Sequence, residues 1–564
     1  MQVARKLCGA LAFCLLIFSG DGAKADSAAG KQGAIATVHA LASEAGLRAM
    51  RRGGNAVDAA VAAGLTLGVV DGFNSGIGGG CFILIRRANG RIVAIDGRET
   101  APATATRDMY LRDGKADPQL SQTGALAVGV PGALAAYEQA SRLYGKLPFR
   151  EIIEAAAKIA EDGFQIDPGY FARLNSVVGD LRRFDSAREI FLTQNGDARP
   201  VGDWLKQADL AKTYRAIGEQ GVDWFYRGAF ARDNETWMRS HGGLFTASDF
   251  AKYSAKSREP IRTTYRGCEI IGFPPPSSGG VHVAQILNIL EHFDLQSMGA
   301  SSADFVHVVT EAMKLAFADR AHWLGDPDFV PVPRGLVAKN YAAKLARQVR
   351  LARASLVSDH GEPERAQQDV FGKHTTHFSA ADADGNWVAC TATINTTYGS
   401  KVVVPGTGVV LNNEMDDFSA QPGAANFFGL VGAEANAIAP GKRPLSSMSP
   451  TIVLKRGKPI LSVGAAGGPT IISQTLLTIV YTIDFGMDLE SALATARFHH
   501  QWKPDELMIE KKIGDEVLRE LERRGHKLKI VNSLGAAQAV ATDPRGKALV
   551  GAHDPRLHGK AAAW

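Results

Sequence analysis

The chain has 564 residues, of which 45% are hydrophobic and 21% are charged, and it contains 60 glycines. This is the composition of a globular protein and excludes a fibrous or largely disordered chain, and the length predicts two domains or one large layered unit. The net charge of +5 comes without a dense run of lysine or arginine, so neither nucleic acid nor an anionic membrane is expected as a partner.

The first 25 residues have the pattern of a secretory signal. Arg5 and Lys6 precede an apolar stretch at residues 7–18, and Ala23 and Ala25 provide the small residues of a cleavage site. The apolar stretch is too short to span a bilayer. We therefore expect cleavage after Ala25 and a mature protein that is periplasmic or secreted. No later apolar run is long enough for a membrane helix, so no membrane association is expected.

Three cysteines remain after the predicted signal. Cys81, Cys268 and Cys390 form an odd and sparse set among apolar residues, which predicts buried free thiols and not a disulfide framework. No group of cysteines and histidines has the spacing of a zinc site, and the adjacent His499 and His500 would point apart on a strand. The sequence therefore predicts neither a bound metal nor a cofactor.

Strands and helices alternate in the first part of the chain. Residues 54–70 are rich in alanine, with small residues at helical spacing, and predict a closely packed helix. Residues 78–98 predict two strands joined by a hairpin turn at Asn89-Gly90. Residues from about 131 to 253 are predicted to be largely helical, and 149–164 have a clear amphipathic pattern.

The middle of the chain contains an irregular segment, two helices and a polar stretch. Residues 272–280, GFPPPSSGG, cannot form regular structure and lead into a helix at 281–293. A second helix is predicted over 303–326. Residues 350–374 are polar and charged and are expected to be exposed and mobile. From Thr375 onward the pattern changes to short strands separated by turns that contain glycine and asparagine.

The first of these strands begins at a pair of threonines. The segments THFSAAD and NWVACTATIN flank Asp384-Gly385, which favours a two-residue hairpin turn. Pairing about that turn places Thr375 opposite Ile394, with Thr393 and Asn395 as its nearest cross-strand neighbours. A one-residue change in the loop would bring one of them onto the face of Thr375. Local geometry therefore predicts two hydroxyls and an amide close together.

Eleven segments in the same order resemble the γ-glutamyltransferase family (γ-glutamyltranspeptidase, glutathione hydrolase). They cover nearly the whole chain after the predicted signal and read GGNAVDAAVA, GGGCF, DGRETAP, FPPPSSGG, AMKLAFADRAHWLGDPDF, TTHFSAAD, TINTTYG, LNNEMDDFS, KRPLSSMSPT, GAAGG and RFHHQW. Each glycine-rich segment alone is weak, whereas eleven segments in the family's order are specific.

The resemblance implies an α+β fold, the four-layer αββα sandwich of the N-terminal-nucleophile hydrolases, made as one precursor. It implies self-cleavage between His374 and Thr375 into a large subunit, 26–374, and a small subunit, 375–564. The two subunits would stay associated as one αββα unit, a heterodimer from a single precursor. Thr375 would then be a chain terminus and its hydroxyl the nucleophile.

Cleavage also supplies the base that the nucleophile needs. A threonine hydroxyl is a poor nucleophile until a base accepts its proton, and a free terminal amine beside it can be that base. Such an amine has a pKa of about 8 and is partly neutral at working pH. Before cleavage the same hydroxyl can attack its own preceding carbonyl, so cleavage comes first and creates the base.

The motifs imply roles for the other site residues. Thr393 resembles the hydroxyl that orients the nucleophile, and Gly467 and Gly468 resemble the pair whose backbone N–H groups form the oxyanion hole. Residues that resemble those binding the substrate α-carboxylate are Arg98, Ser446 and Ser447. Residues that resemble those holding the α-ammonium are Asn395, Glu414 and Asp417. His374 and His377 are assigned no chemistry.

A lid over the site, residues 421–442, departs from the family pattern at one position. In bacterial members that have a lid, an aromatic hydroxyl of the lid bonds the amide at the position of Asn395. Here Phe428 takes that place and has no hydroxyl. We therefore expect closure to be held by packing alone, which leaves the balance between transfer and hydrolysis open.

The resemblance implies transfer of the γ-glutamyl group of glutathione or other γ-glutamyl compounds, through a γ-glutamyl-Thr375 ester, to water, amino acids or dipeptides. Two alternatives stay open. A glutaryl or cephalosporin acylase on the same scaffold would not need Asp417 and Glu414, because its substrate lacks the α-amino group. A processed but catalytically idle binding protein would have no reason to keep both glycines and both hydroxyls.

Overall fold

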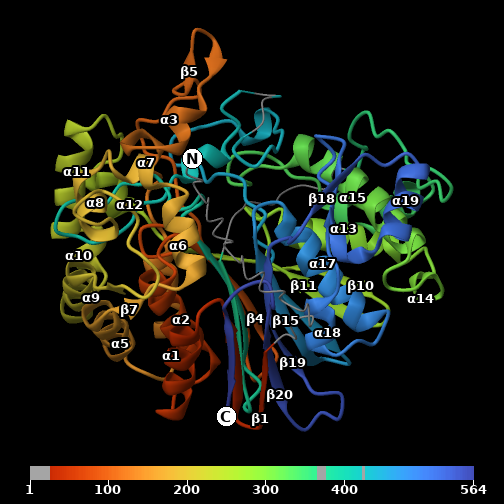
Figure 1. Ribbon diagram of the computed structural model, residues 1–564, viewed down its shortest axis with the longest axis horizontal. Helices are drawn as coiled ribbons and strands as arrows, with labels where there is room; N and C mark the ends of the chain where they lie inside the picture. The colour runs from red at the N-terminus through yellow and green to blue at the C-terminus, as the bar shows by residue number, and fades with distance from the viewer. Residues whose placement is uncertain (1–25, 365–375, 422, 424–425) are drawn as a thin grey trace, which may run out of the picture.

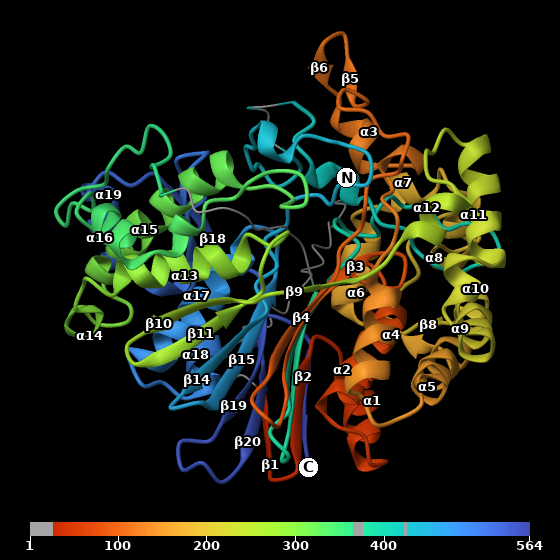
Figure 2. The ribbon, with the colours of Figure 1, turned by 180° about the vertical axis from the view of Figure 1, so that it is seen from behind.

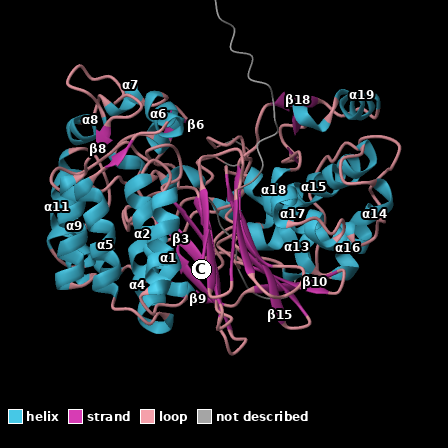
Figure 3. Ribbon diagram, turned by 60° about the horizontal axis from the view of Figure 1, so that its bottom comes forward, coloured by secondary structure: helices cyan, strands magenta, loops and turns pink. Residues whose placement is uncertain are grey.

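The computed structural model describes residues 26–364, 376–421, 423 and 426–564. Two β-sheets lie face to face at the centre, and helices cover the outer face of each sheet (Figures 1 and 3). The predicted α+β sandwich of four layers is therefore confirmed. The predicted signal peptide, His374 and Thr375 lie outside the described residues.

The first sheet is built from parts of the chain that lie before and after residue 375. Its seven antiparallel strands are, in spatial order, β21 (Lys560–Ala563), β2 (Gly33–Thr37), β12 (Thr376–Asp382), β13 (Trp387–Thr393), β3 (Gly80–Arg86), β4 (Ile92–Gly97) and β9 (Lys256–Arg258). The hairpin β12–β13 pairs with β2 on one side and with β3 on the other. The centre of the sheet is complete only when both parts of the chain are present.

The second sheet is mixed in the same way. Its seven antiparallel strands are, in spatial order, β1 (Ser27–Gly30), β20 (Leu549–His553), β19 (Ala536–Thr542), β15 (Lys458–Ala466), β14 (Thr451–Lys455), β11 (Cys268–Gly272) and β10 (Ile261–Tyr265). Figure 2 shows the strands of both sheets seen from behind.

Two groups of helices form the outer layers (Figure 3). The layer on the first sheet contains α1 (Ala40–Arg51), α2 (Ala56–Val70), α4 (Ala133–Tyr144), α5 (Phe149–Asp162), α6 (Pro168–Asn175), α7 (Val178–Leu181), α8 (Asp185–Phe191), α9 (Ala208–Gln220), α10 (Asp223–Tyr226), α11 (Ala229–Ser240) and α12 (Ala247–Lys252). The layer on the second sheet contains α13 (Gly279–Leu290), α14 (Leu295–Met298), α15 (Ala303–Trp323), α16 (Lys339–Ala346), α17 (Thr470–Ile483), α18 (Leu489–Ala494) and α19 (Asp515–Arg523).

Smaller elements lie outside these layers. They are α3 (Pro118–Gln122), the strand pairs β5 (Leu111–Arg112) with β6 (Lys115–Ala116) and β7 (Phe164–Gln165) with β8 (Trp204–Leu205), and a third sheet of β16 (Phe498–His499), β17 (Leu507–Glu510) and β18 (Leu528–Val531). Single 3-10 turns are η1 (Ala125–Ala127), η2 (Arg334–Val337), η3 (Glu414–Asp417), η4 (Glu434–Asn436) and η5 (Lys511–Ile513).

Three hydrophobic cores separate the four layers. Successive side chains of a strand point to opposite faces, so in β3 Cys81, Ile83 and Ile85 face the helices while Phe82 and Leu84 face the other sheet. The second sheet buries its outer face against α13, α15 and α17 in a separate core. The central strands of both sheets are therefore buried on both faces, which explains why strands such as β3 and β14 are apolar at consecutive positions.

Most predicted elements are confirmed. The alanine-rich helix is α2, and its first turn has a capping box in which Asn55 and Asp58 each accept the other's backbone N–H. The predicted helical region from 131 to 253 contains α4 to α12, interrupted by β7 and β8. Residues 350–364 form no helix or strand and are mostly exposed, while the predicted mobility of 350–374 stays a prediction.

Both predicted hairpins form, but with loops of three residues instead of two. After β12, the N–H of Asp382 donates to the carbonyl of Asn386 at 3.0 Å, and Gly385 has a φ of +91°. A three-residue loop that ends in a left-handed glycine shifts the strand pairing by one residue. Thr376 therefore lies opposite Ala392, and the predicted register was wrong. The β3–β4 hairpin has the same loop, with Gly90 at a φ of +86°.

The expected state of the cysteines is confirmed, since Cys81, Cys268 and Cys390 are buried and have free thiols. Among the described residues, no helix is both long and apolar enough to cross a membrane.

Candidate active site

The predicted site residues lie next to the ends of central strands. Arg98 directly follows β4, Thr393 ends β13, Gly467 directly follows β15, and Ser447 precedes β14. The acidic residues come from the 3-10 turn η3, Glu414–Asp417. Residues that are hundreds of positions apart in the chain are thus held by the rigid centre of the sandwich.

Arg98 is the centre of this constellation. Its side chain is fully buried, with Nη1 donating to Oε1 of Glu414 and Nη2 donating to Oδ2 of Asp417 at 2.7 Å. Its Nε donates to the carbonyl of Pro444 at 3.1 Å, which fixes it beside the segment that carries Ser446 and Ser447. The structure therefore joins the predicted carboxylate-binding arginine directly to two of the predicted ammonium acceptors.

Three carboxyl groups share this one guanidinium. Oε2 of Glu99 lies 3.5 Å from Nη1 of Arg98, and Glu414 and Asp417 form ion pairs with the same guanidinium. Burial raises the pKa of Glu414 well above its ordinary value and raises that of Glu99 to about 7. Because burial disfavours a surplus of negative charge, the cluster keeps protons that exposed carboxylates would lose at neutral pH.

Several polar atoms in this constellation are buried and have no hydrogen-bond partner. They are Oδ1 of Asn395, Oε2 of Glu414 and Oγ of Ser447. An unpartnered buried polar atom costs about 1–3 kcal/mol, so these positions favour a ligand that carries complementary groups. The predicted substrate contacts are thus among the atoms that still need a partner.

The two serines differ in their hydrogen bonding. Oγ of Ser446 accepts the N–H of Met448 at 3.3 Å, and its carbonyl accepts the N–H and the hydroxyl of Ser278. The hydroxyl of Ser447 has none of these contacts. Only the oxygen of Ser447 is without a partner, and both hydroxyls still have a proton to donate to a ligand.

Thr393 and Asn395 lie at the end of β13. Oγ1 of the buried Thr393 accepts the backbone N–H of Asn395 at 2.7 Å, and the Asn395 amide donates to the carbonyl of Asn413 at 2.9 Å. A Cβ at Gly79 would lie 1.8 Å from the carbonyl oxygen of Thr393. Glycine is thus required at position 79 for the neighbouring chain to approach the end of this strand.

Gly467 and Gly468 form the connection between β15 and α17. Both have left-handed backbones, with φ values of +123° and +61°, which strain any other residue. A Cβ at Gly468 would lie 2.6 Å from the ring of Phe428. The pair lies before the first turn of α17, where the backbone N–H groups and the helix dipole favour negative charge.

The lid is held by hydrogen bonds as well as by packing, which corrects the expectation of packing alone. The Asn426 amide donates to Oδ1 of Asp417 at 3.3 Å, and the N–H of Phe427 donates to Oδ2 of Asp416 at 3.2 Å. The Gln501 amide donates to the carbonyl of Phe428 at 3.2 Å. Hydrogen bonds from side-chain amides and a backbone N–H thus hold the lid, although Phe428 has no hydroxyl.

The lid residues line two cavities. One, of about 660 Å³, is lined by Phe427 and Phe428 and by Asn395, Gly467 and Gly468 among others. The other, of about 400 Å³, is lined by Asn426 and Leu430 and by Asp417 and Arg320 among others. The predicted oxyanion glycines line the first cavity and Asp417 lines the second, and consecutive lid residues line both.

Sequence reasoning missed two buried charged residues here. Arg320 donates from Nε to Oγ of Ser278 at 3.3 Å, and its Nη2 has no partner. Asp71, at the C-terminal end of α2, accepts the hydroxyl of Thr376 and the amide of Asn74, each at 2.9 Å. Arg320 stands in one of the family-like segments, whereas nothing near Asp71 in the sequence points to Thr376.

His377, which the sequence analysis assigned no chemistry, lies inside the sandwich. It is buried between the hydroxyls of Thr391 and Ser379, at 2.9 and 3.0 Å, and burial lowers its pKa to about 3. A histidine that stays neutral and hydrogen-bonded within the sandwich contributes to packing.

The fold identifies the class of protein. Over 97% of this chain and 99% of that chain, the sandwich superimposes with a TM-score of 0.87 on the crystal structure of a cephalosporin acylase from Bacillus halodurans, at 29% identity. It also resembles a γ-glutamyltranspeptidase from Helicobacter pylori, with a TM-score of 0.55 and 41% identity over 55% of this chain and 90% of that chain. The protein is an N-terminal-nucleophile hydrolase in its architecture.

The sequence comparisons give the family. Residues 42–564 match the gamma-glutamyltranspeptidase family. The chain is 45% identical over 529 residues to a glutathione hydrolase proenzyme of Escherichia coli, which covers 93% of this chain and 90% of that protein. The protein belongs to the γ-glutamyltranspeptidase family, as the eleven sequence segments indicated.

Asp71 predicts a pH dependence of stability. Burial raises its pKa to about 7, so between about pH 4 and pH 7 the folded protein holds a proton that the unfolded chain has lost. The contribution of Asp71 to the free energy of unfolding therefore falls as the pH rises through this window. Between pH 5 and pH 8 we expect the free energy of unfolding of the wild type to fall by roughly 2–3 kcal/mol more than that of Asp71→Asn.

Urea unfolding of both proteins at the two pH values measures this difference. Asp233→Asn, which changes an exposed carboxylate, is the control and should keep the pH dependence of the wild type. Parallel pH dependences of the wild type and Asp71→Asn would show that Asp71 ionises normally.

Proposed function

We propose that this protein is a self-processed γ-glutamyltransferase and glutathione hydrolase. The observation that carries the proposal is the buried Arg98 between Glu414 and Asp417, which is also fixed to the segment that carries Ser446 and Ser447. Such a group offers donors for a carboxylate and acceptors for an ammonium, and a γ-glutamyl group carries both at one end.

Substrate binding would exchange partners within this cluster. The α-carboxylate would take donors of Arg98 and of the two serines, and the α-ammonium would take the carboxylates of Glu414 and Asp417 together with Oδ1 of Asn395. The γ-glutamyl end group is a zwitterion without net charge, so the exchange adds no charge to the buried cluster. Each buried charge would keep a partner, which avoids a penalty of several kcal/mol.

The acylase alternative fits the cluster less well. A relative in structure is a cephalosporin acylase, so the scaffold is compatible with that chemistry. A glutaryl group, however, would bring a carboxylate and no ammonium to a cluster in which three carboxyl groups already share one guanidinium. The added negative charge in a buried site favours a γ-glutamyl substrate over a glutaryl one.

The chemistry would proceed through an ester on Thr375. Its hydroxyl attacks the γ-carbonyl carbon while its terminal amine accepts the proton, and the resulting oxyanion is stabilised by the N–H groups of Gly467 and Gly468. The amide C–N bond then breaks, and the leaving amine takes a proton. Water or an amino group attacks the ester and releases glutamate or a new γ-glutamyl compound.

Thr393 is proposed to orient the nucleophile. The observed register pairs Thr376 with Ala392, so a strand continued backward by one residue would meet Thr393. Its hydroxyl accepts the N–H of Asn395 and therefore still has its own proton to donate. The observed register supports the proposed role of Thr393 better than the register predicted from a two-residue turn.

Processing and export complete the proposal. We propose removal of residues 1–25, export to the periplasm or the medium, and cleavage between His374 and Thr375 into subunits 26–374 and 375–564. Because strands from before and after the proposed cleavage point pair with each other in both sheets, the subunits would share both sheets and stay associated. The acceptors proposed are water, amino acids and dipeptides, and Phe428 against Gly468 would influence which of them reaches the ester.

Self-cleavage is tested on the purified protein. We expect two chains, 26–374 and 375–564, and a single uncleaved chain for Thr375→Ala, because the hydroxyl that attacks the preceding carbonyl is missing. Mass spectrometry and N-terminal sequencing measure the outcome. A small chain that starts at another residue would refute the assignment of the nucleophile.

The role of Thr393 is tested with Thr393→Val, which keeps the β-branched shape. Losing a hydroxyl that positions the nucleophile should reduce kcat roughly 10²–10³-fold, comparable with losing one preorganised donor. Glutathione turnover is measured on protein shown by gel electrophoresis to be fully cleaved. Thr391→Val, whose hydroxyl contacts His377 inside the sandwich, is the matched control. Near-normal turnover of cleaved Thr393→Val would contradict the role.

Substrate selectivity separates the two enzyme readings. We expect glutathione to be cleaved far faster than a glutaryl amide, and Asp417→Ala to narrow this gap by slowing the glutathione reaction, since the ammonium loses a partner. The ratio of kcat/KM values for the two substrates is the measurement. Glu434→Gln, an exposed lid residue, is the control and should keep the ratio. Preference of the unmodified enzyme for the glutaryl amide would replace the proposal by the acylase reading.

A further inference from the structure

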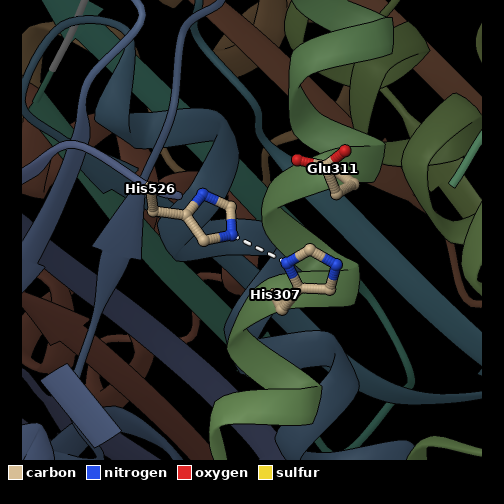
Figure 4. Close-up of side chains that lie close together, drawn as sticks. All are labelled: His307, Glu311 and His526. Carbon is tan, nitrogen blue, oxygen red and sulfur yellow. Dashed lines mark hydrogen bonds between the residues drawn. The ribbon is translucent and has the colours of Figure 1, made fainter. Parts of the chain in front are cut away.

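Three metal-ligating side chains meet in the helical layer that covers the second sheet. His307 and Glu311 lie one turn apart on α15, and His526 lies between α19 and β18 (Figure 4). Nδ1 of His307 is 2.7 Å from Nε2 of His526, and a ligand atom from each of the three residues lies within 4.8 Å of the other two. All three side chains are buried, and none of them lines either of the two cavities beside the lid.

Two of the three ligands are oriented by hydrogen bonds behind them. Nε2 of His307 donates to the carbonyl of Arg350 at 2.7 Å, which leaves the lone pair on Nδ1, directed toward His526. Oε2 of Glu311 accepts the N–H of Ser355 at 2.9 Å, and Oε1 lies 2.9 Å from Nζ of Lys314. A backbone carbonyl behind a histidine and a donor behind a carboxylate are the usual supports of metal ligands.

We propose that His307, Glu311 and His526 bind a divalent transition-metal ion, with Zn²⁺ as the best match. Two imidazole nitrogens and one carboxylate oxygen suit Zn²⁺ better than Ca²⁺ or Mg²⁺, which prefer sets of oxygen ligands. Three protein ligands leave one position of a tetrahedral ion for water. The two histidine nitrogens must separate to about 3.3 Å to fit metal–nitrogen bonds of about 2.1 Å, a small rotation of two side chains.

A lysine beside the site limits its affinity. Nζ of Lys314 lies 2.9 Å from Oε1 of Glu311 and 3.7 Å from Oδ1 of Asp505, and it donates to the carbonyl of Ser355 at 3.2 Å. For the ion to bind, Lys314 must leave Oε1 of Glu311 and pair with Asp505 instead, to which it is already close. Asp505 also lies 3.2 Å from Nε2 of His500. The charged groups that act on the two histidines are the carboxylates Glu311 and Asp505 and the cations Lys314 and Arg524, so positive and negative charges balance around the site.

The ion would connect two parts of the chain. His307 and Glu311 precede the proposed cleavage point, and His526 follows it. The ion would then bridge the two subunits on the outside of the sandwich, where the sheets do not join them. This consequence rests on the proposed cleavage, whereas metal binding by itself does not.

Binding of Zn²⁺ alone tests the site. Protein freed of metal with a chelator is dialysed against Zn²⁺ at increasing concentration, and bound metal is counted by atomic spectrometry. We expect one saturable ion per precursor chain or per heterodimer, and a rise in Tm with Zn²⁺. His526→Gln should bind at least about tenfold more weakly and lose the rise in Tm. His292→Gln, which removes an exposed histidine, should behave as the wild type.

Glu311→Gln keeps the shape of its side chain and provides a second variant if His526→Gln folds poorly by circular dichroism; it too should bind more weakly. The proposal would be overturned if the wild type showed no saturable Zn²⁺ binding. It would also be overturned if a folded His526→Gln or Glu311→Gln variant bound Zn²⁺ as tightly as the wild type. Dialysis reports metal binding whether or not the protein cleaves glutathione, so failure here is distinct from failure of the proposed function.

Discussion

The candidate active site depends on the burial of one positive charge. Arg98 is enclosed between Glu414 and Asp417, with Glu99 behind it, and its Nε is fixed to the carbonyl of Pro444. A buried charge is tolerated only when it is paired and hydrogen-bonded, and removing one partner of such a pair costs about 3–5 kcal/mol. The turn that carries the acids and the segment that carries the serines are therefore held at this point by electrostatics as well as by packing.

The same constraint relates the site to its substrate. A cluster with one guanidinium and three carboxyl groups keeps part of its acid protonated, as the raised pKa values of Glu99 and Glu414 indicate. A zwitterionic end group can enter such a cluster by exchanging partners, whereas an added carboxylate cannot do so without further charge. The proposed preference for a γ-glutamyl group thus rests on charge balance inside a buried site, on a scaffold that a related cephalosporin acylase shares.

Both sheets combine strands from before and after residue 375, and this arrangement positions the charged residues of the site. The hairpin β12–β13 completes the first sheet between β2 and β3, and β14, β15, β19 and β20 complete the second sheet beside β11 and β1. The central strands of each sheet are buried on both faces, so they are fixed by two cores at once. A strand end in such a frame is a rigid place for Thr393, Arg98 or Gly467, and the proposed cleavage before β12 would leave the pairing of the strands intact.

The sequence by itself determined the local elements and the family. The spacing of small residues located α2 and the amphipathic pattern located α5, because these signals act within a few residues. The eleven segments indicated the fold, the nucleophile and the chemical types around it, since those residues occur in specific motifs. The hairpin register was missed by one residue, because a turn of two residues and a turn of three that ends in glycine share the same Asp-Gly signal.

Only the tertiary structure decided which charges meet. The pairing of Arg98 with Glu414 and Asp417, the contact of Asp71 with Thr376, and the approach of His526 to His307 join residues that lie more than 200 positions apart. No pattern of propensity or spacing encodes such contacts, because they depend on how the two sheets and their helices pack. The sequence specified which groups are available, and the packing of the four layers decided their neighbours, their burial and their pKa values.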